Sequence, residues 1–386
     1  MTCPNCSSNS LSDFLFRKRV PVHQNLLMRD QAAAMNIPRG DLALVVCEDC
    51  GFIFNRAFDP QKIMYGKDYE NAQACSPSFN EYLDSLVRRM IEEQNVRDCH
   101  VVEVGCGNGL FLRKLVAYDG GGNTGHGFDP SYRGAENELG GRLKFSARYY
   151  DSECADVPAD VIVCRHVIEH VSQPLQTLAD IRKALARSSK ARIFFETPCV
   201  EWILANQVVW DFFYEHCSYF SAASLSTAFQ VAGFEVQSVR NVFAGQYLWL
   251  EARLSETVPR IDKKPGSVVA QAQSFSRAEM KLKEDWGRKI AALAAKDKVA
   301  LWGAGAKGVT FANLIDGSRQ LIDCVVDLNP LKQGHYVPGT GHPIVSYQAL
   351  TARGVSTAIL MNPNYREENL AFLRAAQADV RLIDHL

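Results

Sequence analysis

The spacing of apolar residues changes along this chain, and the changes divide it into units. Phe79, Leu83, Leu86 and Met90 follow one another at helical spacing, which predicts a helix over residues 79–90. From His100 on, short apolar runs alternate with amphipathic stretches, a pattern typical of an α/β fold with a largely parallel sheet. We predict strands at residues 101–104, 126–128, 161–164 and 192–196, helices at 110–116 and 174–185, and an antiparallel pair at 234–239 and 247–253.

A second α/β unit follows a polar, alanine-rich stretch. Residues 257–298 show no strand pattern, and residues 275–295 should form a long helix that bridges two domains. An apolar run at 299–302 leads into a glycine-rich turn, Gly303-Ala304-Gly305-Ala306-Lys307-Gly308, and the run at 324–326 ends in Asp327. We therefore expect a small module at residues 1–60, a larger α/β domain at 61–256, linker helices at 257–298 and a Rossmann-like domain at 299–386.

The charge balance and the N-terminal residues limit the kinds of partner that this chain is expected to bind. Lys and Arg number 42 against 43 Asp and Glu, so the formal net charge is −1. This balance argues against general attraction to nucleic acid or to an anionic membrane, and a small-molecule substrate fits better. The N-terminus lacks the basic and apolar regions of a signal peptide, and no apolar run approaches the length of a membrane span. We expect a cytoplasmic protein.

Two cysteine pairs near the N-terminus indicate a metal site. Cys3 and Cys6 form one pair, and Cys47 and Cys50, followed by Gly51, form the other. In the cytoplasm such pairs are typical of metal ligands rather than disulfides. Four thiolates suit tetrahedral Zn²⁺ and leave no open coordination position for chemistry. We predict a structural zinc ion in this module, with unrelated buried or redox cysteines as the alternative.

A glycine-rich turn at the end of the first strand of the large domain carries the next signal. Such a turn lets backbone amides approach a ligand in the crevice at the strand ends. An acidic residue ends the following strand, where a carboxylate can accept both hydroxyls of a ribose. The candidate ligand-binding residues at these strand ends are Glu103, Gly105, Cys106, Gly107, Asn108, Gly109, Asp129, Pro130 and, at the end of a later strand, His166.

This arrangement resembles the class I methyltransferases over roughly residues 100–254. The resemblance implies S-adenosylmethionine as cofactor, with residues 103–109 around its amino-acid part, Asp129 at the ribose and His166 beside the sulfonium. Tyr149 and Tyr150 would lie near the adenine. A Rossmann-like domain without a cofactor is the alternative interpretation.

Methyl transfer to an acceptor that must lose a proton calls for a general base. Glu215 and His216 stand among aromatic residues in a loop after the fifth strand, facing the same crevice. A neutral His216 could take the proton, while Glu215 orients it or binds the substrate. The alternative is a packed structural corner. We expect His170 to begin a helix rather than to act as the base.

The order of cysteine pairs, methyltransferase core, Glu-His pair and glycine-rich domain resembles the deoxysugar C-methyltransferases. The resemblance spans nearly the full chain and implies a nucleotide-linked keto sugar as substrate, with Glu215 and His216 matching the residues that remove a proton beside the ketone. That family carries Tyr-His-Glu-His, whereas Phe213 and Tyr214 precede the pair here. A hydroxyl is missing at Phe213, and Tyr214 is the candidate to supply it.

Several alternatives stay open on the sequence. The change at Phe213 keeps O- or N-methylation of another natural-product intermediate in view. A nucleic-acid-binding protein and a scaffold without activity are rivals from other classes. The C-terminal domain is expected to hold substrate or to serve as scaffold, with Lys307 as a candidate phosphate contact, and Asp327 leaves an NAD-like ligand open. The loop at residues 69–71 is either a lid over the site or a surface connection.

Overall fold

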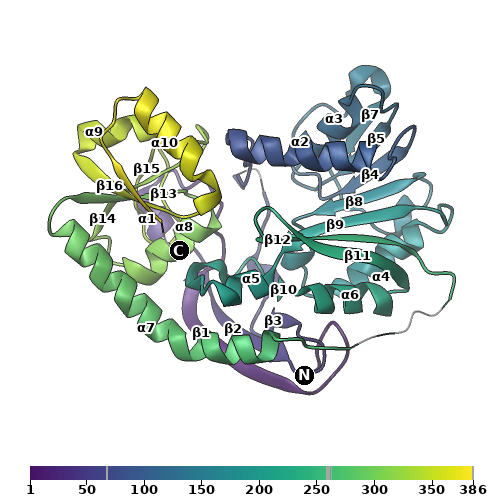
Figure 1. Ribbon diagram of the computed structural model, residues 1–386, viewed down its shortest axis with the longest axis horizontal. Coiled ribbons are helices and arrows are strands. Elements are labelled where there is room, and N and C mark those ends of the chain that lie inside the picture. Colours follow the sequence, from purple (N-terminus) through teal and green to yellow (C-terminus); the bar gives the residue numbers. More distant parts are fainter. Residues whose placement is uncertain (67, 258–260, 262, 385–386) are drawn as a thin grey trace.

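The computed structural model describes residues 1–66, 68–257, 261 and 263–384. Figure 1 shows three sheets, one for each unit expected from the sequence, with the N-terminal module below and between the two larger α/β units. The fold is the predicted class I methyltransferase core, flanked by a small cysteine-bearing module and a C-terminal Rossmann-like domain. No helix in the described parts of the chain combines the length and the apolar character needed to span a bilayer.

The module sheet contains a strand that comes from the large domain. Its order is β1-β2-β3-β10, formed by β1 (Leu11–Pro21), β2 (Arg39–Cys47), β3 (Ile53–Asn55) and the distant β10 (Ser218–Tyr219). All three pairings are antiparallel, and β10 places Ser218 opposite Phe54. The helix α1 (Gln31–Met35) lies between β1 and β2 in the chain. The boundary expected at residue 60 is therefore crossed by strand pairing, which ties the loop before β10 to the module.

The central sheet has the order β11-β12-β9-β8-β4-β5-β7-β6. The strands β4, β5, β7, β8 and β9 are parallel, whereas β12 is antiparallel to both of its neighbours, as predicted for the hairpin. The bounds are β4 (His100–Val104), β5 (Thr124–Phe128), β6 (Asn137–Glu138), β7 (Leu143–Ser146), β8 (Val161–Arg165), β9 (Arg192–Pro198), β11 (Phe234–Val242) and β12 (Tyr247–Leu254). Every strand predicted for this domain is present.

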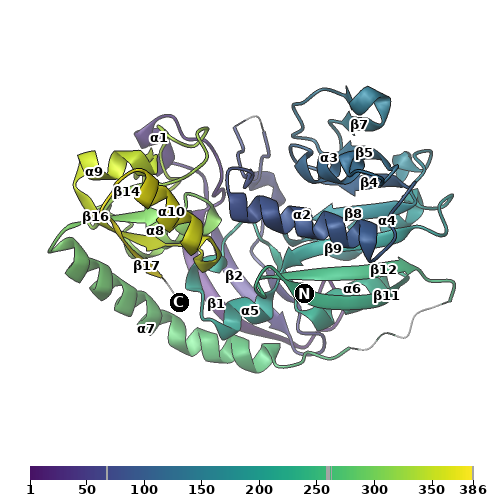
Figure 2. The ribbon, with the colours of Figure 1, turned by 45° about the horizontal axis from the view of Figure 1, so that its top comes forward.

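Helices cover both faces of this sheet, which explains why its inner strands are apolar on both sides. Successive residues of β4 point into different cores: Val101 packs with α2 (Pro77–Glu92) and α3 (Leu110–Ala117), and Val102 packs with α4 (Pro174–Ala184) and α6 (Ala222–Val231). Figure 2 shows α2 along one face of the sheet, with α6 on the other side. The short helix α5 (Val200–Ala205) follows β9 and leads toward the module.

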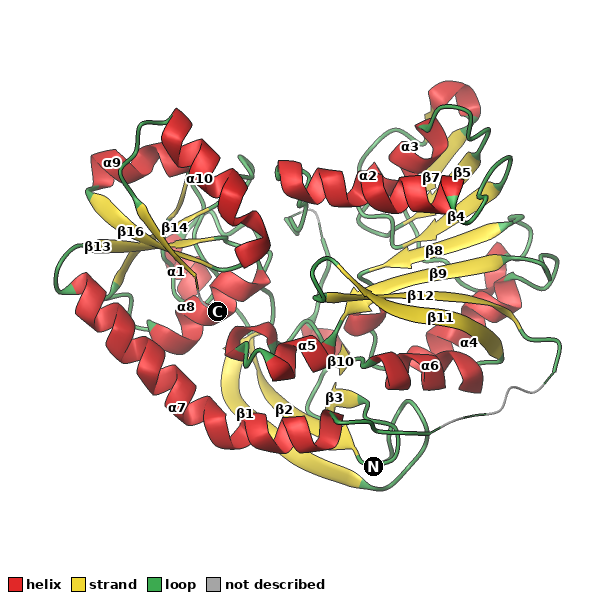
Figure 3. Ribbon diagram, in the orientation of Figure 1, coloured by secondary structure: helices red, strands yellow, loops and turns green. Residues whose placement is uncertain are grey.

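The C-terminal sheet is parallel throughout, in the order β15-β14-β13-β16-β17. Its elements are β13 (Lys298–Trp302), α8 (Ala306–Ile315), β14 (Ile322–Val326), β15 (Ile344–Val345), α9 (Leu350–Arg353), β16 (Val355–Leu360), α10 (Arg366–Ala375) and β17 (Arg381–Asp384). The bridging helix α7 (Val268–Ala294) begins before the predicted residue 275 because Val268 and Ala272 are buried on the same face as Phe275. In Figure 3 this helix runs from the strands β1 and β2 of the module to the C-terminal sheet.

Candidate active site

The glycine-rich turn after β4 is shaped by close neighbours and by open space. Gly105 has a φ of 71°, and a Cβ there would meet Cγ2 of Val167 at 2.2 Å, so a side chain is excluded by both backbone and packing. Gly107 has a φ of 54° but no atom within 4 Å of its Cβ position. Gly109 caps α3 at a φ of 78° against the ring of Phe145. The turn is thus tight against the sheet and open toward a ligand.

Glu103 and Asp129 flank the turn with carboxylates of different character. Glu103 is buried, its Oε2 has no hydrogen-bond partner, and burial raises its pKa to about 8. Asp129 accepts the Gly107 N–H on Oδ2 at 2.8 Å, and Oδ1 accepts the N–H and hydroxyl of Ser131 at 2.8 and 2.6 Å. Asp129 therefore supports the turn, while Glu103 offers an unsatisfied oxygen to a cationic ligand group.

A cavity of about 1120 Å³, here called the donor cavity, lies above this turn. All of the predicted cofactor residues line it except Gly109, which faces the helix. Tyr149 and Tyr150 also line it, although Tyr149 is exposed and Tyr150 is buried against Phe128. Oε2 of Glu103 has no hydrogen-bond partner among the described residues, and Gly107 has open space beside it. Both features fit S-adenosylmethionine, whose ammonium group needs an anionic partner and whose amino-acid part must pass close to the turn.

His166 lies where the donor cavity meets a second cavity. It has a φ of 54°, which is strained for a residue with a side chain and is typical of functional positions. Its Nδ1 lies 3.2 Å from Glu169 and its Nε2 3.6 Å from Glu196. Burial opposes protonation of His166, but these two carboxylates raise its pKa to about 9. Arg165 pairs with Glu196 at 2.6 Å, so two cations and two carboxylates form a balanced buried group.

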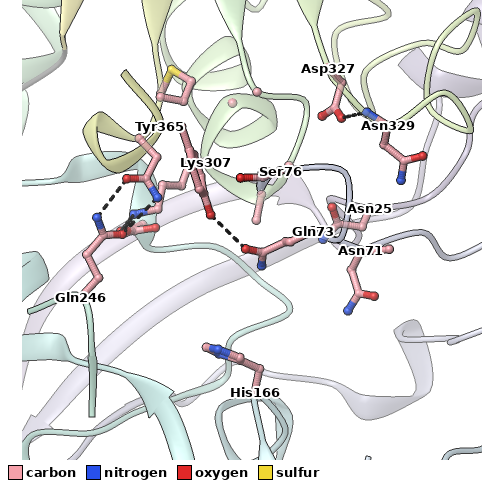
Figure 4. A pocket seen from close by; sticks show the side chains of 18 of the residues that line it. Asn25, Asn71, Gln73, Ser76, His166, Gln246, Lys307, Asp327, Asn329 and Tyr365 are labelled. Carbon is pink, nitrogen blue, oxygen red and sulfur yellow. Dashed lines mark hydrogen bonds and ion pairs between the residues drawn. The ribbon is translucent and has the colours of Figure 1, made fainter. Parts of the chain in front are cut away.

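The second cavity, the acceptor cavity, has a volume of about 300 Å³ and lies between the central sheet, the module and the C-terminal domain. His166 and His170 line both cavities, and Tyr69, Asn71 and Gln73 from the loop before α2 separate them. In Figure 4, Asp327 and Asn329 of the C-terminal domain lie across the cavity from His166. The loop predicted as a lid or a surface connection is thus a wall shared by two cavities.

His216 lines the acceptor cavity and has the properties of a neutral imidazole. Its ring lies 4.1 Å from that of Phe213 and 4.7 Å from that of His170, perpendicular to it. Burial, with the charges of His170, His166 and Lys307, lowers its pKa well below the usual value. His170 lies in the short helix η4 (Ile168–His170), and its Nδ1 is 3.0 Å from the hydroxyl of Tyr65. The two histidines therefore form a pair within the site.

Glu215 and Tyr214 make hydrogen bonds that the sequence did not predict. Glu215 lines the acceptor cavity, but its carboxylate is bound by His23 at 3.0 Å and by the Gln24 N–H at 2.9 Å, not by His216. Tyr214 lines neither cavity; its hydroxyl accepts the Asp59 N–H at 2.8 Å, and its ring fills the space beside Gly40. The role predicted for Tyr214 does not fit this placement, because successive loop side chains point in different directions.

Lys307 and Lys332 contribute to the acceptor cavity in different ways. Lys307 forms an ion pair with Asp211, in the short helix η5 (Val209–Asp211), at 2.7 Å, so its charge is already balanced. Lys332 is only 6% exposed, and its Nζ donates to the side chain of Asn25 at 3.0 Å and to the Ala304 carbonyl at 3.1 Å. No carboxylate of the described residues pairs with Lys332. The sequence indicated Lys307 as the phosphate contact, whereas Lys332 is the lysine of this cavity that has no acidic partner in the described part of the chain.

The four N-terminal cysteines converge on a buried point. The Sγ atoms of Cys3 and Cys50 are 3.8 Å apart and those of Cys6 and Cys47 are 3.6 Å apart, and all four lie within 4.8 Å of one another. A tetrahedral zinc ion with Zn–S distances of about 2.3 Å requires S–S separations of about 3.8 Å. These four residues would hold the metal, and their donor set fits Zn²⁺.

A second group of candidate ligands lies inside the active site. Glu169, His170 and His216 each place one donor atom within 4.8 Å of the other two. Both oxygens of Glu169 are in use, because Thr197 donates to one at 3.0 Å and His166 lies 3.2 Å from the other. The imidazolium of His166 would also repel a cation. The chemistry of this cluster therefore favours proton transfer.

Comparison with known proteins agrees with the fold. A family model described as a methyltransferase domain matches residues 77–239, and one described as a C-methyltransferase C-terminal domain matches residues 262–383. The chain is 24% identical to the C-methyltransferase NovU of Streptomyces niveus over 388 residues, which cover 95% of this chain and 90% of that protein. The chain is a class I S-adenosylmethionine-dependent methyltransferase. The two family models divide this methyltransferase where the structure does, between the central and C-terminal sheets.

Solved structures of other methyltransferases match part of this methyltransferase. The 1,6-didemethyltoxoflavin-N1-methyltransferase of Burkholderia thailandensis, with bound S-adenosylhomocysteine, covers 46% of this chain and 80% of its own, at 15% identity and a TM-score of 0.34. The magnesium protoporphyrin IX methyltransferase of Synechocystis covers 46% and 84%, at 17% identity and the same TM-score.

Proposed function

We propose that this methyltransferase transfers the methyl group to a carbon of a nucleotide-linked keto-deoxysugar, with His216 as the general base. The observation that carries the proposal is the position of His216. It is a neutral imidazole in a cavity that shares His166 and His170 with the donor cavity. An acceptor bound there would lie between the base and the methyl donor.

The residues suit an enolisation followed by displacement. His216 would take the proton from the carbon beside the ketone, leaving an enolate whose carbon then bonds to the methyl group. S-adenosylmethionine supplies that group as an electrophile, and its sulfur keeps the bonding electrons as a neutral thioether. The imidazolium of His166, whose pKa is about 9, would offset the negative charge that develops on the acceptor. The proton taken by His216 then passes to solvent.

Lys332 and the glycine-rich turn of the C-terminal domain support a phosphate-bearing acceptor. Gly308 packs so closely on the Gly303 carbonyl that a Cβ would lie 1.8 Å from it, which brings the N-terminus of α8 onto the sheet. Gly305 has open space beside it on the cavity side. A buried lysine without an acidic partner next to a helix N-terminus suits a diphosphate. Asp327 accepts the N–H groups of Ala304 and Asn329 at 2.8 Å, much as Asp129 accepts those of Gly107 and Ser131 at the donor turn.

O- or N-methylation of another intermediate is the second candidate. It is favoured by the apolar ring of Phe213, which lies against His216 and offers an acceptor ketone no hydroxyl. The same base would serve a hydroxyl or an amine. Carbon is preferred here because both the C-terminal family model and the relative are described as C-methyltransferases.

Exchange of the acceptor proton tests the proposal. In D₂O, with S-adenosylhomocysteine in place of the donor, we expect the enzyme to exchange the proton beside the ketone of a nucleotide-linked keto sugar, as followed by NMR. The His216→Asn variant should not catalyse this exchange. Methylation without any exchange at carbon would favour the oxygen or nitrogen alternative.

A further inference from the structure

The carboxylate of Glu215 is held by the N-terminal module rather than by its neighbour in the site. His23 Nδ1 lies 3.0 Å from Oε1, and the N–H of Gln24 donates to Oε2 at 2.9 Å. All three residues are at most 3% exposed. These bonds join positions more than 190 residues apart, so they hold the loop that carries the base against the module.

A second bond fixes which nitrogen of His23 carries the proton. The backbone N–H of Met64 donates to His23 Nε2 at 3.1 Å, so this nitrogen must present its lone pair. In the neutral ring the proton then lies on Nδ1, where it is donated to Glu215. One imidazole tautomer thus satisfies both contacts.

The residue after Met64 reaches the other histidine of the site. The hydroxyl of Tyr65 lies 3.0 Å from Nδ1 of His170, and the His170 ring meets His216 at 4.7 Å. The ring of His23 also contacts the edges of Tyr65 and Tyr69, at 5.9 and 6.3 Å. His23 therefore contacts both Glu215, in the loop that carries His216, and Tyr65, which bonds to the His170 ring beside His216.

The backbone of the same loop is paired with the module directly after the base. Asn55 donates its N–H to the Cys217 carbonyl at 2.9 Å, and Ser218 pairs with Phe54 in the module sheet. The loop position is thus set by strand pairing on one side of His216 and by the His23–Glu215 bond on the other.

We propose that His23 is a positioning residue for the methyl-transfer site: it orients Glu215, and with it His216, through the Nδ1–H that the contact to Met64 fixes. The inference rests on the proposed role of His216 as base. It assigns the module a part in catalysis that the metal site alone would not give it.

Two isosteric variants separate the two bonds of His23. In His23→Asn the amide nitrogen can take the place of Nδ1 and donate to Glu215, while the contact to Met64 is lost. In His23→Gln the amide oxygen can take the place of Nε2 and accept from Met64, while the donor to Glu215 is lost. His335→Gln, in the C-terminal domain and outside both cavities, is the matched control.

We expect kcat to fall by about 10-fold to 100-fold in His23→Gln, because a small misplacement of a catalytic group has this effect. His23→Asn should keep kcat within a few-fold of the wild type, and the control should keep it unchanged. The affinity for S-adenosylmethionine and the zinc content should be the same in all four proteins. Equal kcat in both His23 variants and the wild type would overturn the proposal, as would a loss of kcat that follows donor affinity.

A measurement that needs no substrate tests the role of His23 independently of the proposed function. In ¹⁵N histidine spectra we expect the wild-type His23 to show the Nδ1–H tautomer, and the His216 signals to shift in His23→Gln but not in His23→Asn. An Nε2–H tautomer, or unchanged His216 signals in His23→Gln, would overturn the positioning role even if no acceptor has been found. Absence of turnover in the wild type with every keto sugar would instead count against the proposed function.

Discussion

His166 and His216 face the same cavity, yet their surroundings shift their pKa values in opposite directions. Burial opposes protonation of both. Glu196 and Glu169 overcome this effect at His166 and raise its pKa to about 9, whereas at His216 the charges of His170, His166 and Lys307 add to burial and lower its pKa. Opposite shifts in neighbouring titratable groups are typical of an acid and a base with separate tasks. This contrast is the main support at the residue scale for His216 as the proton acceptor.

The variant His216→Asn tests that assignment. Because His216 lines only the acceptor cavity, we expect unchanged affinity for S-adenosylmethionine in calorimetry. Turnover should fall by about 100-fold or more, the usual contribution of a positioned base. Wild-type turnover in this variant would rule out His216 as the base.

The pH dependence of His216 should appear in both activity and stability. Because the pKa of His216 lies well below 6.5, the ring is still neutral at pH 6. The value of kcat/KM should therefore stay level down to that pH and fall only at more acidic pH. In the unfolded chain the ring takes up a proton near pH 6.5. Its contribution to stability is therefore present above that pH and lost as pH falls. Urea unfolding at pH 5.5 and 7.5 should show a smaller pH effect in His216→Asn, and an equal effect would contradict the shift.

The raised pKa of Glu103 predicts that binding of S-adenosylmethionine releases a proton. Its pKa of about 8 keeps the carboxyl protonated in the free protein at pH 6.5, and an ammonium group beside it would favour ionisation. The enthalpy of S-adenosylmethionine binding should therefore depend on the buffer, and Glu103→Gln should reduce that dependence and weaken binding. A buffer dependence that is the same in wild type and Glu103→Gln would assign the proton to another group.

The sequence made Glu215, His216 and the cofactor residues candidates but gave no sign of their hydrogen-bond partners. Glu215 and His216 stood out because they follow a strand end among aromatic residues. His23 carried no local signal, since its bonds to Glu215 and Met64 form only when the module folds onto the large domain. The bond between Tyr214 and Asp59 was not predicted for a similar reason: adjacency in sequence says nothing about the direction of a loop side chain.

At the scale of elements, apolar periodicity predicted β4, β5 and β8, whose ends form the donor site, but not β6 or β7 of the same sheet. The parallel strands β4, β5 and β8 end at one edge, so the turn after β4, Asp129 and His166 had to meet there. The strand β10 escaped prediction because a two-residue strand leaves no alternation to detect. Its pairing with β3 is nevertheless what connects the module to the catalytic loop.

Loss of the metal should therefore affect catalysis as well as stability. In Cys47→Ser we expect the zinc content to fall from one ion per chain and the Tm to decrease, because a ligand to a closed four-cysteine site is removed. The kcat should fall more than the donor affinity, because β10 depends on the module sheet. Cys99→Ser, at a partly exposed cysteine outside both cavities, is the control. Full zinc content in Cys47→Ser would contradict the ligand assignment.

At the scale of the whole molecule, the acceptor cavity is formed by all three units. Asn25 comes from the module, His216 from the large domain and Lys332 from the C-terminal domain. None of these could be brought together from the sequence, because the pattern of each unit specifies its own core and not the contacts between units. The C-terminal domain thus contributes to the wall of the site, beyond its role as a scaffold.

Lys332→Met tests this contribution. We expect KM for a nucleotide-linked acceptor to rise by about 10-fold or more, since a charge-assisted contact to phosphate is worth about 1.5–3 kcal/mol. Donor affinity should not change, and the exposed Lys190→Met should behave as wild type. Unchanged KM in Lys332→Met would place the diphosphate elsewhere.

The position of the transferred methyl group tests the whole account most directly. The purified protein would be incubated with S-adenosylmethionine labelled with ¹³C in the methyl group and with a panel of nucleotide-linked keto sugars, and the products would be examined by mass spectrometry and NMR. We predict a product that gains one labelled methyl group bonded to the carbon beside the ketone, with no product from His216→Asn. A labelled methyl group on oxygen or nitrogen, or on carbon with His216→Asn as active as the wild type, would contradict it.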